Sequence, residues 1–333
     1  MKRGWIPLLG ALLVAQILLA TALSMTGRDF GAYHSKEKLL DVDTSKIDGL
    51  AIWDGEKHTI TLARKEGKWV LPGNDDFPAD SDRVTALVDK LTGFTKGWPV
   101  ATTKDAAKRF KVTDAGFERK IQLLEGTKPL ITLYLGTSPG FRKIHARVAG
   151  DDDIYAIEMG TYEAQATAAS WEDKDYLKFT GDKLKQIDIG GLTLQWDGKK
   201  PTLAGLKDGE TLNEAKAKNL VHTVLTLPFA SVLGKERPKD LAGSPELTFQ
   251  VTLKSGEVRH YDIFKSKDGK RHVLKVSTVP YYFTVSDFTF DELKGYDRKS
   301  LVKAANPKSS TNGGKSASTQ GAMASQKAPT PAK

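Results

Sequence analysis

The sequence contains no cysteine. Disulfides, thiolate metal sites, cysteine nucleophiles and cysteine-based lipid anchors are therefore excluded. Histidine is scarce, and its six residues show neither the H-x-x-x-H nor the H-E-x-x-H spacing that places two metal ligands on one helix face. We expect no metal site and no cofactor, while the lack of cysteine fits both the cytoplasm and a bacterial envelope.

Motifs for nucleophilic and phosphate chemistry are also missing. The stretch LGTSPG, residues 135–140, lacks the G-x-x-x-x-G-K-[ST] pattern, and a strand rather than a helix is expected after it. No G-x-S-x-G elbow occurs. Paired carboxylates of the glycosidase kind meet only in space, so a hydrolase with a site built from both halves of the chain stays open as an alternative.

Acidic clusters offer weak support for cation binding. The stretch NDDFPADSD, residues 74–82, does not match the spacing of an EF-hand loop, and we expect it to lead into a capped helix. The run Asp151, Asp152 and Asp153 is typical of a hairpin tip, although a surface cation there remains an alternative.

Positive charge concentrates at the two ends of the chain. The 333 residues carry a formal net charge of +9, to which the ends contribute Lys2, Arg3, Lys308, Lys315, Lys327 and Lys333. The central part is therefore near neutral, and we expect no nucleic-acid partner.

A long apolar run without charge occupies residues 5–25. A helix over this stretch would span roughly 31 Å at about 1.5 Å per residue, close to the hydrocarbon thickness of a bilayer. Ala20-Thr21-Ala22 also fits a signal-peptidase site, so cleavage is the alternative. We favour an uncleaved anchor that keeps Lys2 and Arg3 inside, which predicts a single-pass inner-membrane protein with its bulk outside the cytoplasm.

Two stretches of the chain end in similar eight-residue segments. The first octet is WEDKDYLK at residues 171–178, and the second octet is YDRKSLVK at residues 296–303. Alternating strand patterns separated by Gly-containing turns precede both, at residues 47–71 and 184–204. More paired strands follow at residues 120–157 and 247–285.

The expected main helices also correspond. Asp80 and Asn213 are expected N-caps of helices whose apolar positions lie 133 residues apart, Val84 matching Ala217 and Leu91 matching Val224. A short helix is expected to close each unit.

The predicted fold is α+β: a transmembrane helix in residues 1–27, two tandem repeated modules with antiparallel sheets in residues 28–180 and 181–303, and a disordered tail in residues 304–333. The tail is rich in Ser, Ala, Gly and Lys and has no aromatic residue, so it cannot bury a core.

The anchor, the paired units and the two octets resemble the bacterial family of domains of unknown function 4340 (DUF4340). Stretches such as ARKEGKWVL, LYLGTSP and YDRKSLV are typical of it in style, and the resemblance covers about residues 40–303. It implies an accessory role in the envelope beside ABC-type exporter permeases of the gliding-motility kind. It implies no catalytic residues.

Six residues are candidates for partner contact. Trp98 and Phe229 follow the two main helices, whereas the others occupy matching places in the octets: Trp171 and Lys174, Tyr296 and Lys299. Because the octet positions are repeated, core packing is the main interpretation of these side chains and partner binding the alternative.

We therefore expect a non-enzymatic, membrane-anchored component of an ABC-type export or gliding-motility-like complex. A periplasmic module that binds glycan, lipid or peptide in the cleft between the two units is the alternative.

Overall fold

The computed structural model describes residues 10–18, 21 and 37–304 of the chain. Residues 10–18 are helical and exposed. Within the described residues, none of the helices is both long and apolar enough to cross a membrane. Most of the predicted anchor and almost all of the predicted tail lie outside the described residues.

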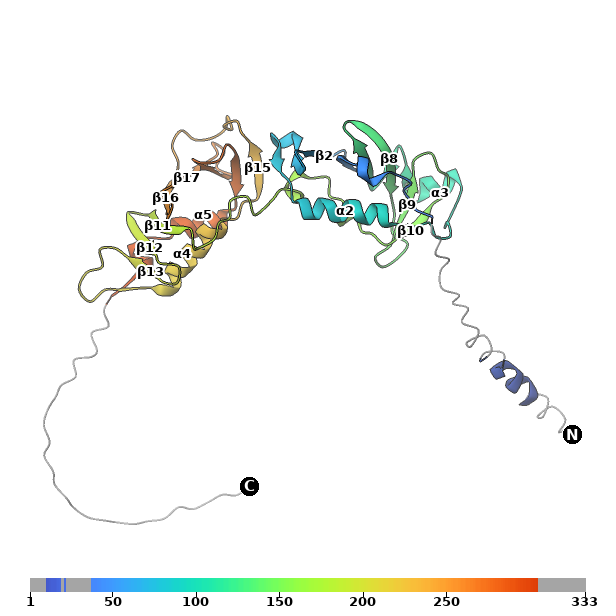
Figure 1. Ribbon diagram of the computed structural model, residues 1–333, viewed down its shortest axis with the longest axis horizontal. Helices are drawn as coiled ribbons and strands as arrows, with labels where there is room; N and C mark the ends of the chain where they lie inside the picture. Colours follow the sequence, from blue (N-terminus) through green and yellow to red (C-terminus); the bar gives the residue numbers. More distant parts are fainter. Residues whose placement is uncertain (1–9, 19–20, 22–36, 305–333) are drawn as a thin grey trace, which may run out of the picture.

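Two eight-stranded antiparallel sheets form the body of the protein and lie in separate lobes (Figure 1). The first sheet has the order β10-β9-β8-β7-β1-β2-β3-β4. Its strands are β1 (Gly49–Asp54), β2 (Thr59–Lys65), β3 (Lys68–Leu71), β4 (Phe77–Pro78), β7 (Arg119–Glu125), β8 (Lys128–Leu135), β9 (Ile144–Val148) and β10 (Tyr155–Ile157).

The second sheet has the order β13-β12-β11-β16-β17-β18-β19-β15. Its strands are β11 (Leu184–Ile189), β12 (Leu192–Trp196), β13 (Pro201–Leu203), β15 (Ser231–Gly234), β16 (Leu247–Leu253), β17 (Val258–Lys265), β18 (His272–Val276) and β19 (Tyr282–Val285). The α+β class with antiparallel sheets is thus confirmed.

The connections within the two sheets are alike. Each begins with a three-stranded meander, β1-β2-β3 or β11-β12-β13, and its first strand then pairs with the first of four later strands, β7 or β16. A 13-residue helix lies between the two groups of strands, α2 (Ser81–Gly93) in the first and α4 (Glu214–Thr226) in the second.

The main helices bury the predicted faces. Val84, Leu87 and Leu91 of α2 are buried, as are Ala217, Leu220, Val221 and Val224 of α4. Asp80 caps α2 by accepting a hydrogen bond from the Arg83 amide at 3.0 Å. Asn213 stands at the N-cap of α4, but its side chain makes no capping bond and points to the Ser300 carbonyl, so that detail of the prediction is wrong.

Each unit also has elements of its own. The first contains α3 (Lys104–Arg109) and the hairpin β5 (Val112–Thr113) and β6 (Gly116–Phe117), and the second contains α5 (Asp287–Lys294), α6 (Arg298–Leu301) and the pair β14 (Thr211–Leu212) and β20 (Val302–Lys303). Short 3-10 turns are η1 (Thr44–Lys46), η2 (Pro72–Asn74), η3 (Thr161–Glu163) and η4 (Ala168–Ser170).

The first octet is not helical, and the predicted closing helix is wrong there. Its first residues are hydrogen-bonded to the segment before α2, and residues 174–177 then form turns. The Asp173 amide donates to the Pro78 carbonyl at 3.0 Å, and the Trp171 carbonyl accepts from the Asp80 amide at 2.8 Å. The second octet contains only the short helix α6. The physical reason is competition, because the backbone groups of the first octet already pair with β4 and its flank.

Candidate functional site at the junction of the two sheets

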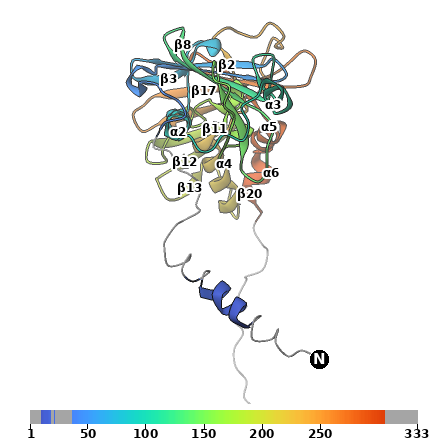
Figure 2. The ribbon, with the colours of Figure 1, turned by 90° about the vertical axis from the view of Figure 1, so that its right-hand side faces the viewer.

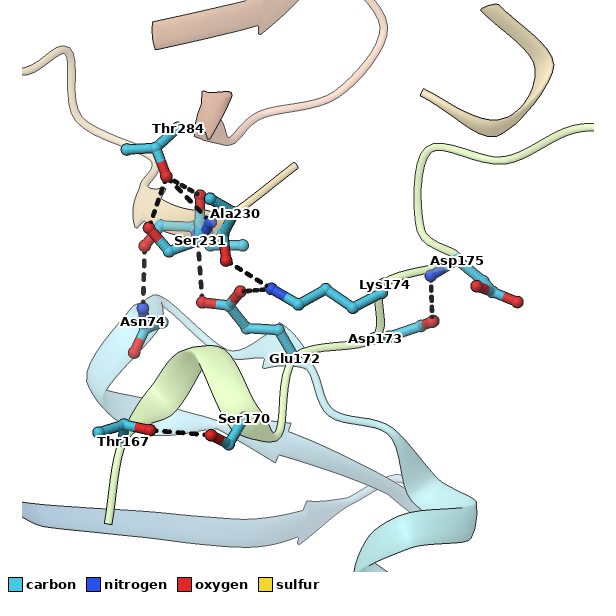
Figure 3. A network of polar contacts seen from close by, with 11 residues as sticks. Asn74, Thr167, Ser170, Glu172, Asp173, Lys174, Asp175, Ala230, Ser231 and Thr284 are labelled. Carbon is cyan, nitrogen blue, oxygen red and sulfur yellow. Dashed lines mark hydrogen bonds and ion pairs between the residues drawn. The ribbon is translucent and has the colours of Figure 1, made fainter. Parts of the chain in front are cut away.

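The edge strand β15 of the second sheet faces the first unit, whose side chains occupy its free backbone groups (Figure 3). The Val232 amide donates to Glu172 Oε1 at 2.9 Å, and the Val232 carbonyl accepts from Asn74 Nδ2 at 3.2 Å. An edge strand otherwise exposes a row of unpaired N–H and C=O groups that invite a further strand. Here polar side chains close that edge.

Two further contacts extend the closure to both ends of β15. Asp75 Oδ2 accepts from the Lys235 amide at 2.7 Å, and Lys174 Nζ donates to the Ala230 carbonyl at 2.7 Å. Lys174 also pairs with Glu172 Oε2 at 2.7 Å. Each Glu172 carboxylate oxygen therefore has one hydrogen-bond donor.

Glu172 is buried at this junction. Its side chain is fully shielded from solvent, while that of Lys174 is 42% exposed. A buried carboxylate is tolerated when it is paired and hydrogen-bonded, and removal of one partner is costly. The contact with Val232 is therefore a structural constraint on how the two sheets meet.

The loop before β4 is strained where it reaches the second unit. Asp75 and Asp76 have φ of 55° and 60°, a region that non-glycine residues seldom adopt. Across the junction Gly234 has φ of 97°, and a Cβ there would lie 2.7 Å from Asp75 Oδ2. The surrounding contacts must hold such a conformation in place.

An aromatic cluster fills the space beside these polar contacts. Phe77 of β4 lies at its centre, with ring centroids 4.8 Å from Tyr176, 5.0 Å from Tyr281, 6.0 Å from Phe283 and 6.1 Å from Phe229. Burial raises the pKa values of the Tyr176 and Tyr281 phenols. The cluster joins the apolar interiors of both sheets into one buried core.

The six candidate contact residues divide by location. Trp171 and Phe229 are buried, with exposed fractions of 0% and 6%. Trp171 packs within the first unit, where Arg83 lies over its ring, whereas Lys174 lies over the Phe229 ring at 4.7 Å across the junction. Trp98, 72% exposed, lies near the opposite edge of the first sheet, just before the bridge between Ala101 and Ile154.

The remaining two belong to the second unit. Tyr296 is 5% exposed and donates to Glu292 at 3.2 Å, whereas Lys299 of α6 is exposed. Burial raises the pKa of Tyr296 to about 12, and the nearby Glu292 carboxylate adds to the rise. The structure thus brings two of the six, Lys174 and Phe229, into contact at the junction.

Sequence reasoning did not identify Glu172, Asn74 or Val232 as junction residues. Asp75 and Asp80 belong to the acidic stretch considered above for cation binding. In the structure Asp75 bonds a backbone amide at the junction, and Asp80 caps α2. Among the described residues, no three His, Asp or Glu side chains gather in a way that could hold a metal ion. What the arrangement can do is fix two sheets against each other.

A comparison with family models gives one match, described as a domain of unknown function (DUF4340), over residues 69–245. The matched range covers just over half of the chain and contains the side chains and backbone groups of the polar contacts at the junction, from Asn74 to Lys235. No curated protein and no solved structure matches.

Proposed function

This chain belongs to the DUF4340 family, and we propose that it is a non-enzymatic, membrane-anchored envelope protein whose two units form a fixed platform for protein partners. The resemblance that was first noted in the sequence implies partners among ABC-type exporter permeases. The proposal rests on three features of the molecule.

The closed β15 edge is the observation that carries the proposal. Four side chains of the first unit bond the backbone of β15 and of its two flanking residues, and five aromatic rings fill the adjacent space. Proteins that close around a small ligand commonly move two domains about a hinge. A junction built in this way favours a single orientation, as a platform for large partners requires.

The apolar run at residues 5–25 supports a membrane anchor. Its length fits the bilayer, and Lys2 and Arg3 before it favour an extracytoplasmic location for the rest of the chain.

The shared strand order supports an origin of the two units by duplication. A three-stranded meander, a 13-residue helix and a four-stranded group occur twice in the same order. We propose that each unit contributes a contact region of its own, marked by exposed Trp98 in the first and exposed Lys299 in the second.

The alternative, a ligand cleft between the units, has less support. Phe77, Tyr176 and Phe283 occupy the region where such a cleft would lie, and Phe77 and Phe283 are fully shielded from solvent. A ligand there would have to displace this packing.

An affinity pull-down from detergent-solubilised membranes tests the proposal. The full chain is compared with a chain that begins at Arg28 and with a full-length Trp98→Ser variant, and Phe288→Ser serves as a matched control because Phe288 is also exposed, at 78%. We expect the full chain and the control to recover a permease and its ATPase, and the other two to recover less. Recovery of neither protein by any form would refute the exporter role.

A further inference from the structure

A cavity of about 500 Å³ opens beside α3, at the end of the first unit that faces the viewer in Figure 2. Its volume falls within the range of small-molecule sites. The lining residues come from α3, the β5-β6 hairpin and the β9-β10 connection: Thr103, Lys104, Ala107, Lys108, Thr113, Asp114, Ala115, Arg147, Gly150 and Asp152. None of them takes part in the junction.

The cavity is specific to the first unit. Residues 103–117 pack on the sheet face opposite α2 through a small cluster of their own, which includes Ala107, Val112 and Tyr134. In the second unit the corresponding connection, residues 235–246, contains no helix. The proposed site is therefore single, although the two sheets share their connections.

Arg147 is held rigidly in the cavity wall. Its side chain is 13% exposed, with Nε donating to the Val112 carbonyl at 2.5 Å and Nη1 donating to the Asp151 carbonyl at 2.8 Å. Its guanidinium also lies 5.2 Å from the centre of the Tyr134 ring. These contacts fix the plane of a group that binds carboxylate and phosphate oxygens through paired N–H donors.

The Nη2 group of Arg147 has unused donor capacity. Its nearest acidic oxygen, Asp114 Oδ1, is 3.7 Å away, which is too far for a hydrogen bond. Asp114 is 83% exposed, so it can turn toward water at little cost. Burial, and then the nearby Asp114, raise the pKa of Tyr134 to about 12, so this phenol stays neutral.

Charge and apolar surface complete the site. Lys104 and Lys108 of α3 join Arg147, so three cations face the two acids Asp114 and Asp152. Ala107 and Ala115 add apolar wall between the charged groups. The lining thus offers a net positive charge and room for a short organic body.

We propose that this cavity binds a small organic anion, with its carboxylate or phosphate on the open edge of Arg147 and its apolar part between α3 and the β5-β6 hairpin. Asp114 yields its place near Arg147 when the anion enters, and the two lysines draw the anion in. This site is independent of the partner surfaces proposed above.

Isothermal titration of the full chain in mild detergent tests the site with three probes. These are inorganic phosphate, glycerol 3-phosphate and N-acetyl-alanyl-alanine. The neutral control is N-acetyl-alanyl-alanine amide, in which an amide replaces the carboxylate. The phosphate and carboxylate arms show which anion the site prefers. Arg147 itself is left unchanged because its bonds to the backbone support the fold.

Three variants act on the cavity without touching its buried supports. Lys104→Glu combined with Lys108→Glu and, separately, Ala115→Phe should each weaken binding at least tenfold, whereas Asp114→Asn should strengthen it about threefold. Lys216→Glu, on the exposed side of α4, is the matched control and should change nothing. The melting temperature of each variant confirms that it is folded.

The proposal is supported if at least one charged probe binds saturably and the affinities of the variants change in the directions given above. Lack of saturable binding by every charged probe would overturn it. So would affinity that the cavity variants leave unchanged, or equal affinity for the neutral amide.

Discussion

Glu172 of the first unit accepts a hydrogen bond at 2.9 Å from the backbone amide of Val232 in the second, and its side chain is fully shielded from solvent. Sixty residues separate the two in sequence. One carboxylate thus ties the first octet to the edge strand of the other sheet, and its second oxygen is held by Lys174.

Replacement of this carboxylate should destabilise the whole body. In Glu172→Gln the amide group faces Lys174 instead of an anion, and we expect a loss of roughly 1–3 kcal/mol in the free energy of unfolding. Urea denaturation measures it. The control is Lys178→Ala, which removes the exposed ion pair between Lys178 and Asp175 in the same octet and should cost less than about 0.5 kcal/mol. Equal losses of unfolding free energy in the two variants would contradict the account.

The aromatic cluster should contribute more than the polar contacts. Phe283 is completely buried and contacts Phe77 and Phe229, so Phe283→Ala should lower the free energy of unfolding by roughly 3–5 kcal/mol. Phe288→Ala, at an exposed position of α5, is the control and should stay within about 0.5 kcal/mol of the parent. A loss below about 1 kcal/mol at Phe283 would show that the junction is loosely packed.

Two effects of adding a Cβ at Gly234 can be measured separately: the steric clash with Asp75 and the strain of a positive φ. Gly234→Ala combines a positive φ with a Cβ 2.7 Å from Asp75, whereas Gly256 has φ of 91° and open space around it. We expect Gly234→Ala to cost roughly 1–3 kcal/mol more than Gly256→Ala, as measured by thermal or urea unfolding. Equal costs would mean that Asp75 moves away freely.

The free energy of unfolding should decrease as the pH is lowered because of His145. The ring is stacked on Phe110 with centroids 3.9 Å apart, and burial lowers its pKa from the ordinary 6.5. At pH values below 6.5 the unfolded chain binds a proton at this histidine, whereas the folded chain remains unprotonated there until the pH reaches its lower pKa. The contribution of neutral His145 to the free energy of unfolding is therefore fully present above pH 6.5 and is lost as the pH falls toward the folded pKa.

Urea midpoints at about pH 7.5 and about pH 5.5 measure this effect. His145→Gln should reduce the acid loss. His58 is the control with the opposite sign, because its hydrogen bond with Asp54 raises its pKa and its contribution is lost as the pH rises; His58→Gln should therefore steepen the acid loss. An unchanged pH dependence in His145→Gln would contradict the interpretation.

Much of the fold could be predicted from local patterns. The strands Ile144–Val148, Leu247–Leu253 and His272–Val276 have the bounds that their apolar runs and flanking turns indicate. The faces of α2 and α4 also follow from helical spacing, because one burial stripe dominates each. These features depend on neighbours in sequence, which the sequence displays directly.

The junction depended on contacts that no local pattern marks. A helix was predicted for the first octet because its aromatic, acidic and apolar positions fit one, but β4 and its flank provide better partners for that backbone. The contact between Glu172 and Val232 arises only when an edge strand of a distant sheet arrives. Nothing in the sequence had indicated α3 or the cavity beside it.

The distance between the two units tests the central claim most directly. Because the chain has no cysteine, spin labels can be placed at Lys128→Cys in β8 and Lys216→Cys in α4, both exposed, and read by double electron–electron resonance. A junction that fixes the sheets predicts one narrow distance distribution, which broadens in Glu172→Gln and in Phe283→Ala. A broad or two-peaked distribution in the parent protein would contradict the fixed platform and would favour a hinge.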